Sequence, residues 1–317
     1  MVFKTEIDFY DFYDLGDFWR TSFNLPNGAR FIFWNCSLRY VKSNDYHYLE
    51  IISDQRDNIE ECLLILSFCT TIPLSELDYD IISIDNREFV NNQQQDKMVE
   101  WDRKLSEIEQ ILRNSRNRSD DIREMYFDFM RKCILGARNG YRGYVEDEFM
   151  MYFKPIEKIS KLYLNNYSII RGQVDRNLKS AFQRFLKEDI LHDTLNLEFD
   201  SPTLQEVTGK VYNLFKNEIV SNNHRRISVA WERLVTYNSR DDLQQQVELL
   251  NKIDSLKIHE LVKVRNKISH GEIVELPPEI RGNVEYLSYQ MISLYIFGKK
   301  YDSIHLSSKK FNYDFWS

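Results

Sequence analysis

The chain has 317 residues, of which 43% are hydrophobic and 29% charged, so a substantial core is expected and a disordered polymer is excluded. Its formal net charge is −7 and its pI is about 5.5, which excludes a strongly basic protein that coats nucleic acid with its whole surface. A cleft that is only locally basic remains compatible with this charge. The length allows two domains, or one large domain with an appendage.

The cysteines and the chain start indicate where the protein works. The four cysteines form no Cys-x-x-Cys pair and lack histidines at ligand spacing, so no metal site is expected; they are Cys36, Cys62, Cys69 and Cys133. They are typical of buried free thiols in a reducing cytosol. The first residues do not resemble a secretion signal, and no apolar run is long enough to span a membrane. We therefore expect a cytoplasmic protein without cofactor, metal or membrane contact.

The first 53 residues are dense in aromatic side chains. A turn is predicted at Pro26-Asn27-Gly28, a strand over 29–41, a turn at 43–45 and a strand over 46–52. Together they indicate a small antiparallel unit. The aromatic residues are compatible with base stacking, as on single-strand binding platforms, or with filling a small mixed core, which is the more common arrangement.

Helices and a further strand are expected next. The apolar spacing predicts a helix over 57–70 that ends before Pro73, a strand over 79–90 and a charged helix over 100–118. A basic cluster lies at the end of the charged helix and beyond it; it consists of Arg113, Arg116, Arg118 and Arg123. It fits contact with an RNA backbone, or simply a solvated helix end and loop, which is the commoner case.

A domain boundary is predicted near residue 140. A helix capped at 119–121 runs to about Ala137, and Gly136, Gly140 and Gly143 are expected to loosen the connection after it. This divides the chain into a mixed α/β sensing or regulatory domain over 1–140 and a helical domain over 141–317. The predicted fold class is α+β and predominantly α-helical, with an N-terminal mixed region followed by an all-α bundle.

The second half is predicted to contain helices over residues 146–164, 173–191, 203–220, 228–234 and 285–297, with an aromatic tail to Ser317 that folds back. Pro155 is expected to kink the first of these helices. One long amphipathic helix is predicted from Asp241 to His270, with Gly271 just past its end and Pro277-Pro278 beyond. Its apolar stripe consists of Leu243, Val247, Leu250, Ile253, Leu261, Val264 and Ile268.

Three polar residues lie near the end of this helix. Asn266 and His270 are four residues apart and share a face, whereas Arg265 and His270 are about 140° apart around an ideal helix. They fan out around one groove, and His270 lies where the helix dipole favours positive charge. His259, eleven residues before His270, is expected on the surface.

The pattern Arg265-Asn266-x-x-x-His270, after an apolar run and before Gly271, resembles the signature of the HEPN family. That resemblance implies an all-helical, usually dimeric domain, in many members a metal-independent ribonuclease of defence or toxin systems. It implies catalytic roles for Arg265, Asn266 and His270, with Lys267 as a supporting residue, at a cleft shared by two copies.

Two weaker similarities concern a supporting carboxylate. The run Tyr152-Phe153-Lys154-Pro155-Ile156-Glu157 resembles an early core helix of the family, and Ala230-x-Glu232-x-Leu234 resembles it too. Glu157 is the predicted supporting residue, which would orient Arg265. The alternative packing partner, Glu232, stays open.

RNA cleavage without a metal requires attack of the 2′-hydroxyl on the neighbouring phosphate, with a base, an acid and cationic donors for the phosphorane. One Arg and one His supply half of this, and a two-fold dimer supplies the whole. We therefore expect an endoribonuclease homodimer acting on RNA, with a regulatory or antitoxin partner and without stable DNA binding. The alternative is a non-catalytic HEPN scaffold for dimerisation, nucleotide binding or RNA binding.

Overall fold

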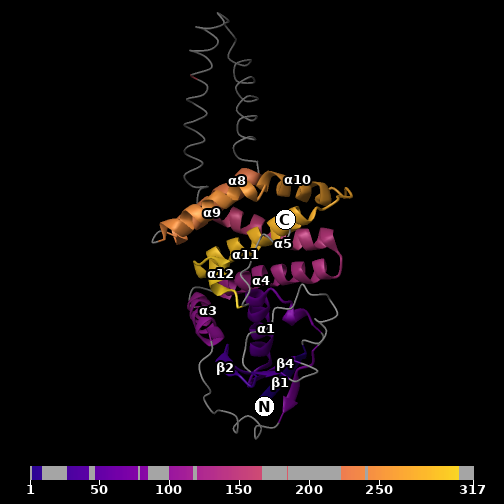
Figure 1. Cartoon of the computed structure of the whole chain (residues 1–317), viewed down its shortest axis with the longest axis vertical. Coiled ribbons are helices and arrows are strands. Elements are labelled where there is room, and N and C mark those ends of the chain that lie inside the picture. Colours follow the sequence, from indigo (N-terminus) through magenta and orange to yellow (C-terminus); the bar gives the residue numbers. More distant parts are fainter. Residues whose placement is uncertain are drawn as a thin grey trace, which may run out of the picture.

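A computed structural model describes residues 2–8, 27–42, 47–77, 79–84, 100–116, 120–165, 184, 223–239 and 242–306. The fold is α+β and predominantly helical, as predicted. Among the described residues, a small antiparallel sheet lies at one end, and helices α8, α9 and α10 lie at the opposite end (Figure 1). The division into two domains at residue 140 stays a prediction.

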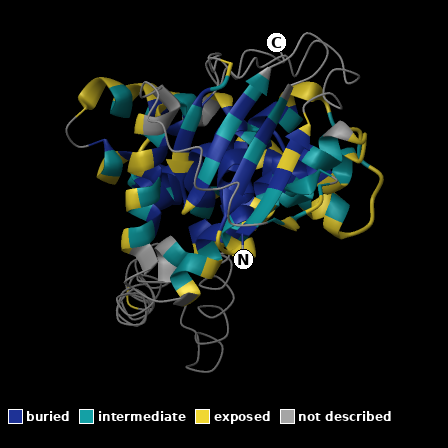
Figure 2. Cartoon of the chain, turned by 90° about the horizontal axis from the view of Figure 1, so that it is seen from below, coloured by how far each residue is buried: buried dark blue, intermediate teal, exposed yellow. Residues whose placement is uncertain are grey.

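The sheet has five strands in the order β2-β3-β4-β1-β5, every neighbouring pair antiparallel. The strands are β1 (Val2–Asp8), β2 (Arg30–Phe33), β3 (Cys36–Lys42), β4 (His47–Ser53) and β5 (Ile82–Ile84). In the register, Leu38 lies opposite Ile51, which lies opposite Thr5, and all three are buried. Buried and more accessible residues alternate along the strands (Figure 2), because successive side chains point to opposite faces.

The strand predicted over 29–41 is a hairpin, so that prediction was wrong. Trp34 and Asn35 both have positive φ, 54° and 56°, and form the two-residue turn between β2 and β3. Such turns match the twist of a hairpin but usually contain Asn and Gly. Because Trp is not a typical residue at this position, the sequence did not indicate a turn here. Of the strand predicted over 79–90, the structure describes β5, while 85–90 and the predicted turn at 43–45 lie outside the described residues.

Helix α1 (Arg56–Thr70) lies between the sheet and the other helices (Figure 1). Every residue from Cys62 to Thr70 is buried, so the helix is covered on all sides over its second half. The short 3₁₀ helix η3 (Leu74–Glu76) follows it. One continuous core joins the sheet, through α1, to the C-terminal helices, and all four cysteines are buried free thiols within it.

The remaining helices are α3 (Glu100–Arg116), α4 (Asp120–Tyr141), α5 (Val145–Asn165), α8 (Asn223–Asn238), α9 (Leu243–Ser255), α10 (Ile258–Ser269), α11 (Pro278–Phe297) and α12 (Tyr301–Ile304). Helix α11 is central, and its side chains are buried around most of its circumference. The helices predicted over 173–191 and 203–220, and the end of the tail after residue 306, lie outside the described residues. No helix in the described ranges has both the length and the apolar character needed to cross a bilayer.

Of the three glycines predicted to loosen the connection, Gly143 lies in the turn with a positive φ of 80°, but Gly136 and Gly140 do not loosen the chain, which corrects that expectation. Gly136 and Gly140 are inside α4, which continues to Tyr141. A Cβ atom at Gly136 would lie 3.0 Å from the Tyr152 ring, and one at Gly140 would collide with the Glu148 carboxylate. These glycines therefore let α5 approach α4 closely, and the actual connection is the short turn before Val145.

The long helix predicted from Asp241 to His270 is two helices, which is a further correction. Asp242 accepts a hydrogen bond from the Gln245 backbone N–H at 2.9 Å and begins α9. Between α9 and α10, Lys257 adopts the left-handed conformation with φ 48°, and Leu256 is buried. Apolar spacing continues through this break, so periodicity alone did not show it.

Candidate functional site

Helix α10 presents the Arg265-to-His270 motif at its C-terminal end. Leu261 and Val262 anchor its inner side. The end is a Schellman motif: the Gly271 N–H donates to the Ile268 carbonyl and the Glu272 N–H to the Lys267 carbonyl, both at 3.0 Å. Gly271 has the positive φ of 75° that this motif needs. His270 is the exposed residue that closes the helix.

Arg265 points inward, toward α5. Its Nη2 lies 3.0 Å from Oε1 and 3.2 Å from Oε2 of Glu157, and its Nη1 donates to Asn266 Oδ1 at 3.3 Å. The Nε atom is enclosed without a hydrogen-bond partner. Glu232, on α8, is exposed. Of the two carboxylates left open by the sequence, Glu157 is therefore the one that contacts the motif helix.

His270 lies apart from Arg265. No hydrogen bond or ion pair joins the two within the ranges that the structure describes, in keeping with their wide separation around the helix. Asn266 and Lys267 are exposed beside His270. One copy of the chain thus brings Arg265, Glu157 and Asn266 together and leaves His270 facing solvent.

The described members of the predicted basic cluster are engaged in internal contacts. Arg123 lies 2.5 Å from Glu61, and Arg113 lies 2.6 Å from Glu109. Both guanidinium groups lie against the Trp34 ring, at 5.0 Å for Arg113 and 5.8 Å for Arg123. The two arginines hold the β2–β3 hairpin against α3 and α4. Their positive charge is already neutralised by Glu109 and Glu61.

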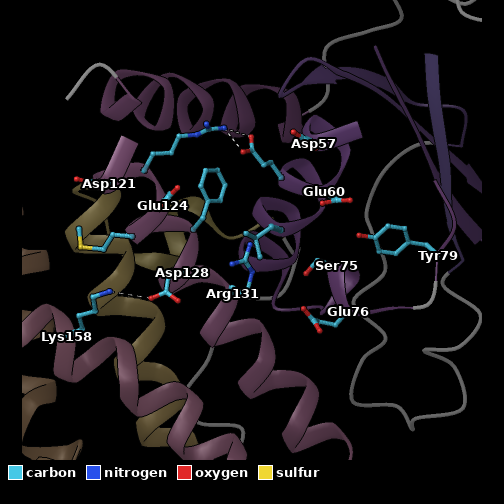
Figure 3. Close-up of a pocket in the computed structure, with 15 residues that line it drawn as sticks. Asp57, Glu60, Ser75, Glu76, Tyr79, Asp121, Glu124, Asp128, Arg131 and Lys158 are labelled. Atoms are coloured by element: carbon cyan, nitrogen blue, oxygen red, sulfur yellow. Dashed lines mark hydrogen bonds and ion pairs between the residues drawn. The ribbon is translucent and has the colours of Figure 1, made fainter. Parts of the chain in front are cut away.

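A cavity of about 1040 Å³ lies between α1, η3, α4 and α5 (Figure 3). Seven carboxylates line it: Asp57, Glu60, Glu61, Glu76, Asp121, Glu124 and Asp128. Three cations oppose them, and two of these, Arg123 and Lys158, already pair with Glu61 and Asp128. The cavity is therefore acidic and unfavourable for a polyanion. Sequence reasoning missed it because its carboxylates come from three separate elements.

A second polar cluster joins α5 to α11. Arg281 Nη2 lies 2.7 Å from Glu148 Oε2, and the Tyr152 hydroxyl donates to Glu285 Oε1 at 3.2 Å. Burial, and then the nearby Glu148 carboxylate, raise the pKa of Glu285 to about 7, while Tyr152 and Arg281 oppose the shift. Burial also raises the pKa of Glu148, against the effect of Arg281.

In the described part of the chain, no group of three or more His, Cys, Asp or Glu side chains is placed to hold a metal ion. Comparisons with known proteins add no assignment: no family model, curated protein or solved structure matches the chain. The fold defines the class, an α+β and mainly helical protein, and the function must be argued from the site.

Proposed function

We propose that the chain is a HEPN-type endoribonuclease that cleaves RNA without a metal, at a site formed by two copies. The observation that carries the proposal is the contact of Arg265 with Glu157, next to an exposed His270 at the end of the same helix. This arrangement fixes the direction of a guanidinium and leaves an imidazole accessible. We further propose that the enzyme works in the cytoplasm, in phage defence or a toxin system, under a regulatory or antitoxin partner.

The chemistry divides between the two copies. A base removes the proton of the ribose 2′-hydroxyl, whose oxygen attacks the adjacent phosphorus. The bond to the 5′-oxygen breaks, and an acid returns a proton to that leaving oxygen. The products are a 2′,3′-cyclic phosphate and a 5′-hydroxyl. His270 from each copy supplies the base and the acid, and Arg265 from each copy stabilises the charged phosphorane.

The need for a second copy follows from the geometry of one copy. Arg265 faces α5 and His270 faces solvent, so the described part of one chain places no second imidazole beside His270. A two-fold axis near the end of α10 duplicates both residues around one cleft. Asn266 and Lys267, exposed beside His270, then supply donors to the substrate.

A non-catalytic HEPN scaffold is the second candidate, and one observation favours it. The Arg265 guanidinium already has a carboxylate partner in Glu157 and an amide partner in Asn266. An arginine satisfied in this way suits a module that dimerises, or one that binds a nucleotide or RNA without cleaving it.

Cleavage of a mixed RNA pool in EDTA tests the proposal. The wild type is compared with His270→Ala, Arg265→Ala and the control Arg56→Ala, whose arginine pairs with Glu60 on α1, away from the motif. We expect fragments with cyclic phosphate ends from the wild type and the control. Both motif variants should lose at least about 100-fold in rate, because each removes a group that acts in the transition state.

The scaffold predicts a different pattern. Under it, no form cleaves RNA, and the motif variants instead lose ligand affinity with fold and dimer intact. Equal cleavage by all four forms would contradict both candidates, since the activity would then come from elsewhere. Mass determination in solution, over a range of protein concentrations, separately tests whether the wild type dimerises.

A further inference from the structure

We propose that the outward face of α10 is a binding track for the phosphate backbone of single-stranded RNA, running from His270 to His259. The inference rests on the proposed function for the identity of the ligand. It adds residues that hold the strand on one side of the cleaved phosphate, and so deepens that function.

Five residues define this face, here called the α10 track: His259, Lys263, Asn266, Lys267 and His270. Their spacings of four, three, one and three residues place them within an arc of about 100° on an ideal helix. All five are exposed. The opposite side of the helix, with Ile258 and Leu261, is buried against the body. The α10 track is therefore a polar strip along a helix that lies, within the described part of the chain, far from the sheet (Figure 1).

The two lysines of the α10 track have no carboxylate partner within the described ranges. Some lysines elsewhere in the chain do have one: Lys132 with Asp128 at 2.6 Å and Lys299 with Glu107 at 2.5 Å, and so does Lys257, just before α10, with Glu279 at 2.9 Å. Glu260, near the start of the helix, is the single carboxylate that α10 carries. In a chain of net charge −7, Lys263 and Lys267 in line with His270 form a local positive strip that attracts a polyanion.

The length of the helix sets how much of a strand the α10 track can hold. Eleven residues separate His259 from His270, which is about 16 Å along a helix and enough for several nucleotides. At the far end, the His259 ring meets the His224 ring of α8 at 5.2 Å. In the proposed dimer, two such tracks line opposite walls of one cleft.

Binding of an RNA that cannot be cleaved tests the α10 track apart from catalysis. The probe is a short fluorescein-labelled single strand with 2′-O-methyl groups, which keeps the phosphates and lacks the attacking hydroxyl. Affinity is measured by anisotropy with the full chain, between about 50 and about 200 mM KCl. The variants are Lys263→Ala and Lys263→Glu, and the matched control is Lys257→Ala, whose lysine is already paired with Glu279.

We expect Lys263→Ala to weaken binding about three- to tenfold at low salt, and to reduce the slope of log affinity against log salt by about 0.7. Lys263→Glu should weaken it further, because it adds repulsion, and Lys257→Ala should match the wild type. Circular dichroism and thermal unfolding confirm that the variants are folded, as expected for an exposed position.

Equal affinity and salt slope for all four proteins would overturn the α10 track, as would a wild type that does not bind the probe at low salt. The outcome is separable from that of the proposed nuclease. If Lys263 contributes to binding but ordinary RNA is not cleaved, the α10 track is supported and the proposed nuclease is contradicted. If RNA is cleaved and Lys263→Glu leaves KM unchanged, the proposed nuclease is supported and the α10 track is contradicted.

Discussion

Glu157 on α5 holds the Arg265 guanidinium of α10 between both of its carboxylate oxygens, at 3.0 and 3.2 Å from Nη2. The two residues are 108 positions apart in the chain. The side chains are 17% and 27% exposed, so neither charge is fully hydrated and each depends on the other. The pair therefore fastens the motif helix to the core and fixes the direction of Arg265.

A double-mutant cycle measures this coupling. Glu157→Ala and Arg265→Ala should each lower the free energy of unfolding by about 1–2 kcal/mol, because each leaves a partly buried charge without a partner. The double variant should lose less than the sum, by about 1 kcal/mol. Urea unfolding monitored by circular dichroism gives the values. The matched cycle on the exposed Arg56–Glu60 pair should give about 0.3–0.5 kcal/mol.

A coupling between Glu157 and Arg265 no larger than that of the surface pair would contradict this account. The contact would then be incidental. Glu157 would also lose its position as the residue that orients Arg265, and the catalytic proposal would have to do without it.

The substitution Gly271→Ala tests the backbone at the helix end separately from the side chains of the motif. Gly271 has a φ of 75°, which an alanine adopts at a cost of about 1–2 kcal/mol, and an added Cβ would meet no atom within 4 Å. The effect is thus confined to the backbone after His270. We expect a lower melting temperature and, under the proposed function, slower RNA cleavage, because the cap that holds His270 is weakened.

Gly28→Ala is the matched control for that experiment. Gly28 has a φ of 78°, and its added Cβ would likewise meet nothing within 4 Å, but it lies in the turn before β2. It should lower stability to a similar degree and leave cleavage by the folded protein unchanged. A Gly271→Ala protein with wild-type cleavage would show that the cap does not position His270.

The sequence predicted those elements whose bounds depend only on residues nearby in the chain. The bounds of α1 and α5 follow from apolar spacing, and the end of α10 follows from Gly271, because these features act within a few residues of their own position. Burial of the cysteines as free thiols followed from the lack of any pairing or metal-ligand pattern among them.

Features that depend on distant partners did not follow from the sequence. The residue type of Gly136 and Gly140 predicts a helix break, but both lie inside α4. There they are the positions at which Tyr152 and Glu148 approach this helix closely. The left-handed Lys257 divides a continuous apolar stripe, and burial of Leu256 in the core accompanies that division. The choice of Glu157 over Glu232 likewise needed the packing of α10 on α5.

Trp34 gives a prediction about how the hairpin is held to the helices. Its Nε1 donates to Glu61 at 2.6 Å, and its side chain is 4% exposed although it occupies a turn. Trp34→Phe should cost about 1–2 kcal/mol through the lost hydrogen bond, and Trp34→Ala about 3–5 kcal/mol through the cavity. Thermal or urea unfolding measures both.

The neighbouring Ile32→Ala is the control, since Ile32 is 68% exposed on the same hairpin and should change stability by less than about 0.5 kcal/mol. Losses of equal size for Trp34→Ala and Ile32→Ala would mean that the hairpin does not depend on its contact with α3 and α4. Arg113 and Arg123 would then be available to other ligands.

Glu285 makes stability depend on pH. Its folded-state pKa of about 7 lies above the ordinary value of 4.5, chiefly because of burial and then because of Glu148, against Tyr152 and Arg281. The folded chain therefore binds this proton more tightly than the unfolded chain. The resulting stabilisation is complete below about pH 4.5 and is lost as the pH rises through about 7.

Glu285→Gln should remove that dependence, because the amide stays neutral and keeps an oxygen to accept from Tyr152. Relative to the wild type, the variant should gain stability on the order of 2 kcal/mol between pH 5 and pH 8. Urea unfolding of both proteins across this range gives the difference, and Glu279→Gln, an exposed carboxyl on α11, should keep the wild-type profile. A difference that stays flat with pH would mean that Glu285 is ionised in the fold, with Arg281 shared between it and Glu148.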